Sequence, residues 1–121
     1  MNVLICSKYK YSHRWNDVKS ALEIRGHKCT TPLDIDLELH AKTNAEMTNE
    51  EYLQSVISYH EHIKNAEVLY VLNYDGEFGK SMMLEVGYAA ALGKTIICLE
   101  SYEREPSLQN FVTMIAMPSE I

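Results

Sequence analysis

The sequence has few of the residues that mark a disulfide-bonded, zinc-binding or membrane-spanning protein. It contains only three cysteines, Cys6, Cys29 and Cys98, and their spacing suits neither a disulfide framework nor a zinc site. No apolar run approaches the roughly 20 residues that a membrane span needs. We therefore expect three buried free thiols, each at the edge of a predicted strand, in a reducing compartment.

Positive charge is also scarce. Lysine and arginine total 11 against 17 acidic residues, which leaves a net charge of -6. This balance argues against broad adhesion to a nucleic acid polymer or an anionic membrane. The chain enters the apolar run Asn2–Cys6 without the basic region and apolar core of a signal peptide. A cytoplasmic location is the expectation.

Proline and glycine are sparse as well, with three and five residues in a chain of 121. We find no linker, internal repeat or low-complexity tract, so residues 1–121 are expected to form one domain. Short apolar runs predict strands, and they alternate with helical patterns; the runs are Val3–Cys6, His27–Thr31, Val68–Leu72 and Thr95–Leu99. This alternation predicts a doubly wound α/β domain with a parallel sheet of four or five strands, the fifth rudimentary.

Local signals place the helices. Apolar residues from Trp15 to Leu22 share one helical face, and Gly26 is the expected stop. Thr48 and Glu51 form a capping-box pattern that opens the next helix. A third helix is expected from about residue 81 to 92, before Gly93. Pro106 suits the first turn of a last helix through about residue 115.

The segment from Leu33 to Met47 lacks a convincing period. Irregular segments of this length often form lids or binding loops. The acidic alternation of Asp34, Asp36 and Glu38 fits a solvated edge better, and we expect these carboxylates to face water.

A polar loop between the third strand and the third helix is the strongest candidate site, because ligands bind at the carboxyl ends of parallel strands. We expect Glu85 in the first turn of that helix, where the macrodipole favours the ionised form. Such a carboxylate suits nucleophilic attack on a sugar carbon, although it could instead only stabilise the helix. Gly87, costly inside a helix, predicts tight packing or a ligand nearby.

Two further carboxylates, Asp75 and Glu77, lie in the same loop. Asp75 precedes Gly76 and suits a turn, but it could also accept a hydrogen bond from a ribose or a base. A magnesium site formed by Asp75, Glu77 and Glu85 has no motif to support it. His60 and His62 point to different sides of a helix and are expected to be structural.

The first loop gathers hydroxyls and cations, among them Ser7, Lys8 and Lys10, in an otherwise acidic chain. Next to a helix N-terminus these groups suit a phosphate, although a solvated loop is an equally good interpretation. The first and third strands should be neighbours, which would bring the two loops together. The tyrosines near both loops could stack on a base or simply pack; they are Tyr9, Tyr11, Tyr74 and Tyr88.

Three segments carry a resemblance to a known family: Val3–Ser7, Leu22–His27, and above all Ala66–Lys94 with its Glu85-Val-Gly-Tyr-Ala and Gly93-Lys motifs. The sequence resembles the nucleoside 2-deoxyribosyltransferase-like superfamily over nearly its whole length. The resemblance implies a Rossmann-like, flavodoxin-type three-layer α/β/α fold and cleavage of the N-glycosidic bond of a nucleoside or nucleoside 5'-monophosphate. It also implies a homodimer, and no cofactor or metal is expected.

In that family the glutamate matching Glu85 is the nucleophile, and the aspartate resembling Asp75 contacts the substrate. The resemblance further implies that Ser7 and Ser81 hold a phosphate. The full candidate set consists of Glu85 and Asp75 as catalytic residues and, as substrate-binding residues, Ser7, Lys8, Tyr9, Tyr11, Asn73, Gly79, Ser81 and Tyr88. Because the first loop lacks the glycine-rich form of the nucleotide hydrolases, the alternative is a module that binds a nucleotide without cleaving it.

Overall fold

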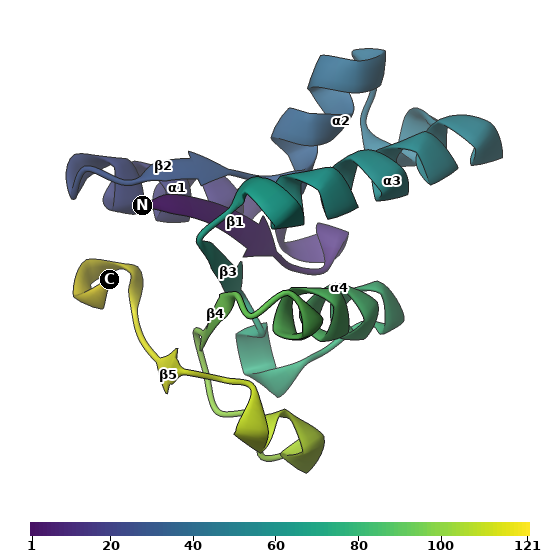
Figure 1. Cartoon of the computed structure of the whole chain (residues 1–121). Coiled ribbons are helices and arrows are strands. Elements are labelled where there is room, and N and C mark those ends of the chain that lie inside the picture. Colours follow the sequence, from purple (N-terminus) through teal and green to yellow (C-terminus); the bar gives the residue numbers. More distant parts are fainter.

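The computed structural model describes all 121 residues and contains one parallel five-stranded sheet in the order β2-β1-β3-β4-β5 (Figure 1). The strands are β1 (Asn2–Cys6), β2 (Lys28–Thr30), β3 (Val68–Val71), β4 (Thr95–Cys98) and β5 (Met114–Ile115). This order is that of flavodoxin-like folds, in which ligands bind where the order reverses, between β1 and β3. The predicted α/β fold and the pairing of β1 with β3 are confirmed, and β2 lies at one edge of the sheet.

Helices cover both faces of the sheet. Helix α1 (Trp15–Ile24) lies on one face, whereas α3 (Asn49–Asn65) and α4 (Lys80–Ala91) cover the other. Successive strand residues point to opposite faces: in β1, Val3 and Ile5 pack on the α1 side, and Leu4 and Cys6 on the α3–α4 side. The predicted three-layer arrangement is therefore present. All three cysteines are free and buried, as predicted.

Capping chemistry fixes the helix ends that the sequence indicates. The Thr48 hydroxyl accepts a hydrogen bond from the Glu51 amide at 3.2 Å, and the Glu51 carboxylate accepts one from the Thr48 amide at 3.1 Å. Gly26 and Gly93 have φ of 90° and 72° just after α1 and α4, a conformation that only glycine adopts at no steric cost. These three predicted boundaries are confirmed.

The prediction of an irregular segment from Leu33 to Met47 was wrong. Helix α2 spans Pro32–His40 and is followed by a 3-10 turn, η2, at Asn44–Glu46. Thr31 caps α2, because its hydroxyl accepts from the Asp34 amide at 3.1 Å while its own amide donates to the Asp34 carboxylate at 2.9 Å. Pro32 is the first residue of this helix, where its missing N–H costs nothing.

The prediction of a last helix from Pro106 to about residue 115 was also wrong. Only a short 3-10 helix forms, at Pro106–Asn110. The chain then extends along β4, where the Thr113 amide donates to Ile96 at 2.7 Å and the Ala116 amide donates to Cys98 at 2.9 Å. The open edge of the sheet outcompetes local helix propensity and yields the expected rudimentary fifth strand.

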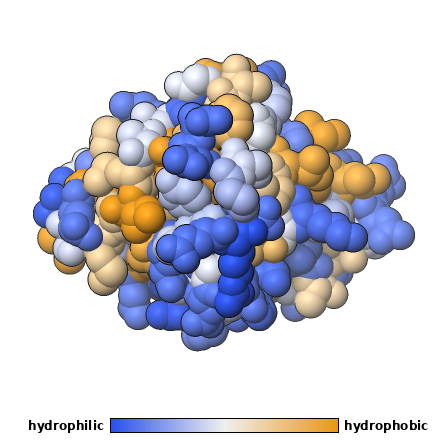
Figure 2. Space-filling view, turned by 90° about the horizontal axis from the view of Figure 1, so that it is seen from below, coloured by the Kyte–Doolittle hydropathy of each residue, from blue (hydrophilic) through white to orange (hydrophobic).

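The surface is predominantly polar. On the face seen from below, hydrophobic residues form separate patches among hydrophilic ones (Figure 2). No helix has both the length and the apolar character that a membrane crossing requires.

Candidate functional site

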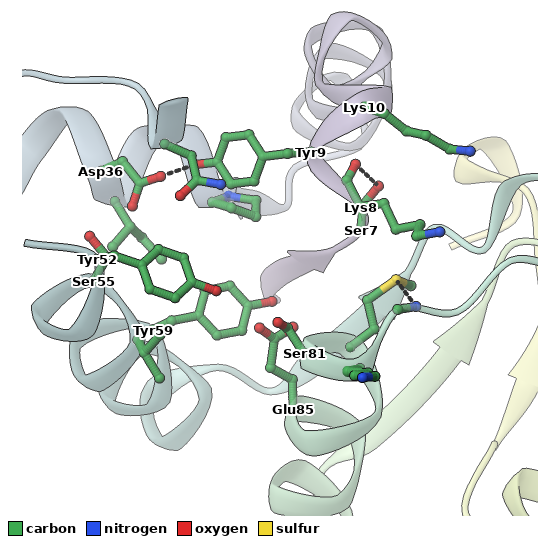
Figure 3. Close-up of a pocket in the computed structure, with 17 residues that line it drawn as sticks. Ser7, Lys8, Tyr9, Lys10, Asp36, Tyr52, Ser55, Tyr59, Ser81 and Glu85 are labelled. Carbon is green, nitrogen blue, oxygen red and sulfur yellow. Dashed lines mark hydrogen bonds between the residues drawn. The ribbon is translucent and has the colours of Figure 1, made fainter. Parts of the chain in front are cut away.

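A cavity of about 520 Å³ opens at the carboxyl ends of β1 and β3 (Figure 3). The loop after β1, helices α2 and α3, and the start of α4 line it. Its volume lies in the range of small-molecule sites. Of the residues predicted for the site, six line the cavity: Ser7, Lys8, Tyr9, Gly79, Ser81 and Glu85.

Glu85 lies in the second turn of α4, not in the first turn as predicted, because the helix begins at Lys80. Its carboxyl is largely enclosed, and burial raises the pKa of Glu85 from its usual 4.5 to about 7, while a hydrogen bond from Cys6 acts in the opposite direction. The expectation that the helix dipole would favour the ionised form was therefore wrong, because desolvation outweighs it. Glu85 can take up or release a proton near neutral pH.

One neutral donor, the Cys6 thiol, bonds the Glu85 carboxyl, and the Tyr59 hydroxyl on α3 is engaged elsewhere. The Cys6 thiol donates to Glu85 Oε2 at 3.1 Å, and the Tyr59 hydroxyl donates to the carbonyl of Ile5 at 2.6 Å. Burial raises the pKa of Cys6 and the pKa of Tyr59 well above their usual values, and the negative charge of Glu85 adds to the effect. Both groups therefore keep their protons, and Glu85 takes part in none of the ion pairs of the chain.

Hydroxyls and cations lie on the wall formed by the first loop and the start of α4 (Figure 3). Ser7 and Lys8 come from the first loop, and Lys80 and Ser81 from α4. Lys80 has no acidic partner, whereas Lys8 lies 3.6 Å from Glu77. This wall can accept an anion, as the first-loop composition suggested.

Glu77 holds the outer cations of the first loop in place. Lys10 lies 2.7 Å from its carboxylate, and the Tyr11 hydroxyl donates to the same oxygen at 2.8 Å. These two contacts lower the pKa of Glu77 to about 2. Tyr11 is thus engaged with Glu77 and does not line the cavity.

Three other predicted residues also lie outside the cavity. Asn73 is completely buried. Its Nδ2 donates to the carbonyl of Glu100 at 2.9 Å, and its Oδ1 accepts from the Glu100 amide at 2.9 Å. Asp75 is exposed with φ of 58°, a turn conformation, and Tyr88 stacks on His60 with ring centroids 4.9 Å apart. In this conformation all three have structural contacts, and their contact with substrate stays a prediction.

The sequence interpretation missed a second acidic residue in the cavity. Asp36 on α2 is only 5% exposed and accepts a hydrogen bond from the Tyr9 hydroxyl, so the prediction that it faces water was wrong. Tyr52, Ser55 and Tyr59 of α3 complete this wall. The Thr31–Asp34 capping pattern was the available signal, because a helix beginning there turns Asp36 inward beside Ile35, which is also buried.

No group of histidine, cysteine and acidic residues is arranged to hold a metal ion. His62 bonds the carbonyl of Ser58 at 2.9 Å, whereas His60 stacks on Tyr88. Gly87 was expected to mark tight packing or a nearby ligand. The packing alternative was wrong, because a Cβ there would meet no atom within 4 Å, and the ligand stays a prediction.

No protein-family model and no curated protein matches the sequence. Solved structures do match. A 2-deoxyribosyltransferase from Bacillus psychrosaccharolyticus superposes with a TM-score of 0.74 at 15% identity, over 99% of this chain and 89% of that one. A CMP N-glycosidase from Clostridium botulinum superposes with a TM-score of 0.61 at 18% identity, over 97% and 87%. The chain thus shares the fold of these two proteins.

Proposed function

We propose that the protein cleaves the N-glycosidic bond of a nucleoside or nucleoside 5'-monophosphate, with Glu85 as the nucleophile. The observation that carries this proposal is a carboxyl group in the cavity that no cation neutralises. In retaining glycoside chemistry such a carboxylate attacks the anomeric carbon. The two solved neighbours are described as a deoxyribosyltransferase and an N-glycosidase, which supports the same class of reaction.

The proposed reaction has two steps. Ionised Glu85 attacks the anomeric carbon, the carbon–nitrogen bond breaks, and the base leaves with the bonding electron pair and takes up a proton. Water then attacks the glycosyl ester, loses a proton and releases the sugar and the carboxylate; in a transferase a second base replaces the water. Cys6 keeps one carboxylate oxygen oriented by its 3.1 Å hydrogen bond, which leaves the other oxygen available for attack.

The cation and hydroxyl wall supports a 5'-phosphate. Lys8 and Lys80 of the cavity lining supply charge. Ser7 and Ser81 supply hydroxyl donors on the Glu85 side of the cavity (Figure 3). An anion held there would place the attached sugar next to Glu85. We therefore expect a nucleotide to be a better substrate than the matching nucleoside.

Free base released from a panel of nucleosides and 5'-monophosphates, measured by chromatography, tests the proposal. Glu85→Gln should lower the rate on the order of a thousandfold, since it removes the nucleophile. Glu61→Gln is the matched control, because Glu61 is an exposed acid on α3 away from the cavity lining. Base release by Glu85→Gln at the wild-type rate would overturn the role of Glu85. Saturable binding of a nucleotide that stays intact would favour the binding module instead.

We further propose that two copies pair through α3 and α4. The stacked His60 and Tyr88 join these helices, and about one turn earlier on each lie Ile57 and Leu84, which are 66% and 72% exposed. Sedimentation should detect a dimer that Ile57→Glu together with Leu84→Glu dissociates. Ile24→Glu is the control, since Ile24 is 87% exposed on α1. A wild-type monomer would contradict this proposal.

A further inference from the structure

The Asp36 carboxyl is the acidic group in the cavity lining that the proposed reaction does not use. It lies on α2, while Glu85 lies on α4, and in Figure 3 the two stand at different sides of the cavity with Tyr52 and Tyr59 between them in the view. A bound nucleotide that presents its sugar to Glu85 must place its base elsewhere in the cavity. The side lined by Asp36 is available for it.

One oxygen of Asp36 is engaged by a tyrosine: Oδ2 accepts the hydrogen bond of the Tyr9 hydroxyl. Burial raises the pKa of Asp36, and the neighbouring Ser55 hydroxyl and His40 act in the opposite direction. Oδ1 is not among the fully buried polar atoms that lack a hydrogen-bond partner. Asp36 is also part of the cavity lining. No lysine or arginine pairs with this carboxyl. A largely buried carboxylate without a cation is stabilised by a further hydrogen-bond donor, which a ligand in the cavity can supply.

The surroundings hold this acceptor in a fixed direction. The Tyr9 ring packs edge-on against the buried Trp15, with centroids 5.1 Å apart, so the hydroxyl that orients Asp36 is itself restrained. Tyr52, which is 41% exposed, lines the same part of the cavity. A tyrosine ring offers a flat surface on which a base can stack.

We propose that Asp36 Oδ1 accepts a hydrogen bond from the exocyclic amino group of the base, so that the protein selects bases with an amino group over their oxo counterparts. This inference rests on the proposed function for the nature of the ligand. A carboxylate and an oxo group can both only accept hydrogen bonds, whereas an amino group donates them. An oxo base would thus leave two acceptors facing each other in a site shielded from water, which is unfavourable.

Two pairs of nucleotides exchange this group: the 5'-monophosphates of cytidine and uridine, and those of adenosine and inosine. Within each pair the exocyclic group changes from amino to oxo, and the neighbouring ring nitrogen changes from an acceptor to an N–H donor, so the two pairs are compared at the exocyclic position that Asp36 is proposed to contact. Dissociation constants from calorimetry should favour the amino member by about tenfold or more in every pair that binds, the usual scale of one base-edge contact. Equal or tighter binding of the oxo member, or no binding of any of the four, would overturn the inference.

Asp36→Asn provides the matched variant, because it keeps the shape and lets the amide donate toward the cavity while its oxygen still accepts from Tyr9. The amino preference should fall to about unity or reverse, since a donor now faces the oxo group. Glu38→Gln on the exposed side of α2 is the control and should keep the wild-type preference. An unchanged preference in Asp36→Asn would contradict the role of Asp36, and the wild-type comparison decides the question even if this variant fails to fold.

Base release measured on the same four nucleotides separates this inference from the proposed function. Release without discrimination between amino and oxo members would refute the role of Asp36 and leave the cleavage proposal standing. Discriminating binding without release would refute cleavage and support the role of Asp36.

Discussion

Replacing Glu85 by glutamine should stabilise the protein at alkaline pH. The reason is that burial raises the pKa of Glu85 from 4.5 to about 7, so the folded state binds this proton more tightly than the unfolded chain does. Between these two pH values the unfolded state loses the proton first. Stability therefore falls as the pH rises from about 4.5 to about 7 and stays low above it.

The magnitude follows from the difference between the pKa of Glu85 in the folded state and in the unfolded chain. A difference of one pH unit between the two corresponds to about 1.4 kcal/mol, so an ionised Glu85 costs the folded state about 3 kcal/mol above pH 7. Glutamine carries no charge at any pH and can still accept the hydrogen bond from Cys6. The difference in free energy of unfolding between Glu85→Gln and wild type should therefore shift in favour of the variant by up to about 3 kcal/mol between about pH 5 and pH 8.

Urea denaturation of both proteins at about pH 5 and pH 8, at equal protein concentration, measures this gain. Comparing the two pH values cancels any constant effect of burying an amide. Glu77→Gln is the control. Contacts from Lys10 and Tyr11 lower the pKa of Glu77 to about 2, so Glu77 is ionised throughout this pH range. The destabilisation that Glu77→Gln causes relative to wild type should therefore be nearly the same at both pH values. A Glu85→Gln effect that is independent of pH, or that destabilises more at pH 8, would refute the reasoning.

Three further predictions concern Glu85, Thr48 and Gly87. If Glu85 must be ionised to attack, kcat/KM for base release should rise about tenfold per pH unit and level off near pH 7; a flat profile from pH 5 to 8 would contradict this. Thr48→Ala should lose about 1 kcal/mol in urea denaturation, because it removes the cap bonded to the Glu51 amide, and an unchanged midpoint would argue against the capping box. Gly87→Ala should gain about 0.5–1 kcal/mol, since a Cβ there meets no atom within 4 Å; destabilisation would show that another molecule packs on this face.

The sequence by itself determined the parallel sheet and several helix ends, but not helix α2 or the C-terminal segment. Alternating apolar runs and helical patterns specified the parallel sheet, because burial on both faces requires continuous apolar strands such as Val68–Val71. Local capping groups at Thr48, Gly26 and Gly93 set helix ends, since a cap needs only neighbouring residues. The position of Glu85 after β3 also placed it at the ligand-binding edge.

Only the tertiary structure decided the chemistry of the site. The pKa of Glu85 depends on how deeply α4, Cys6 and Tyr59 enclose it, and no local pattern encodes that enclosure. In the same way, the sequence pattern predicted that Asp36 faces water, whereas in the folded chain α2 places it against Tyr9. Desolvation and long-range hydrogen bonds arise when distant segments pack together, whereas strands and helix caps depend on neighbours in the chain.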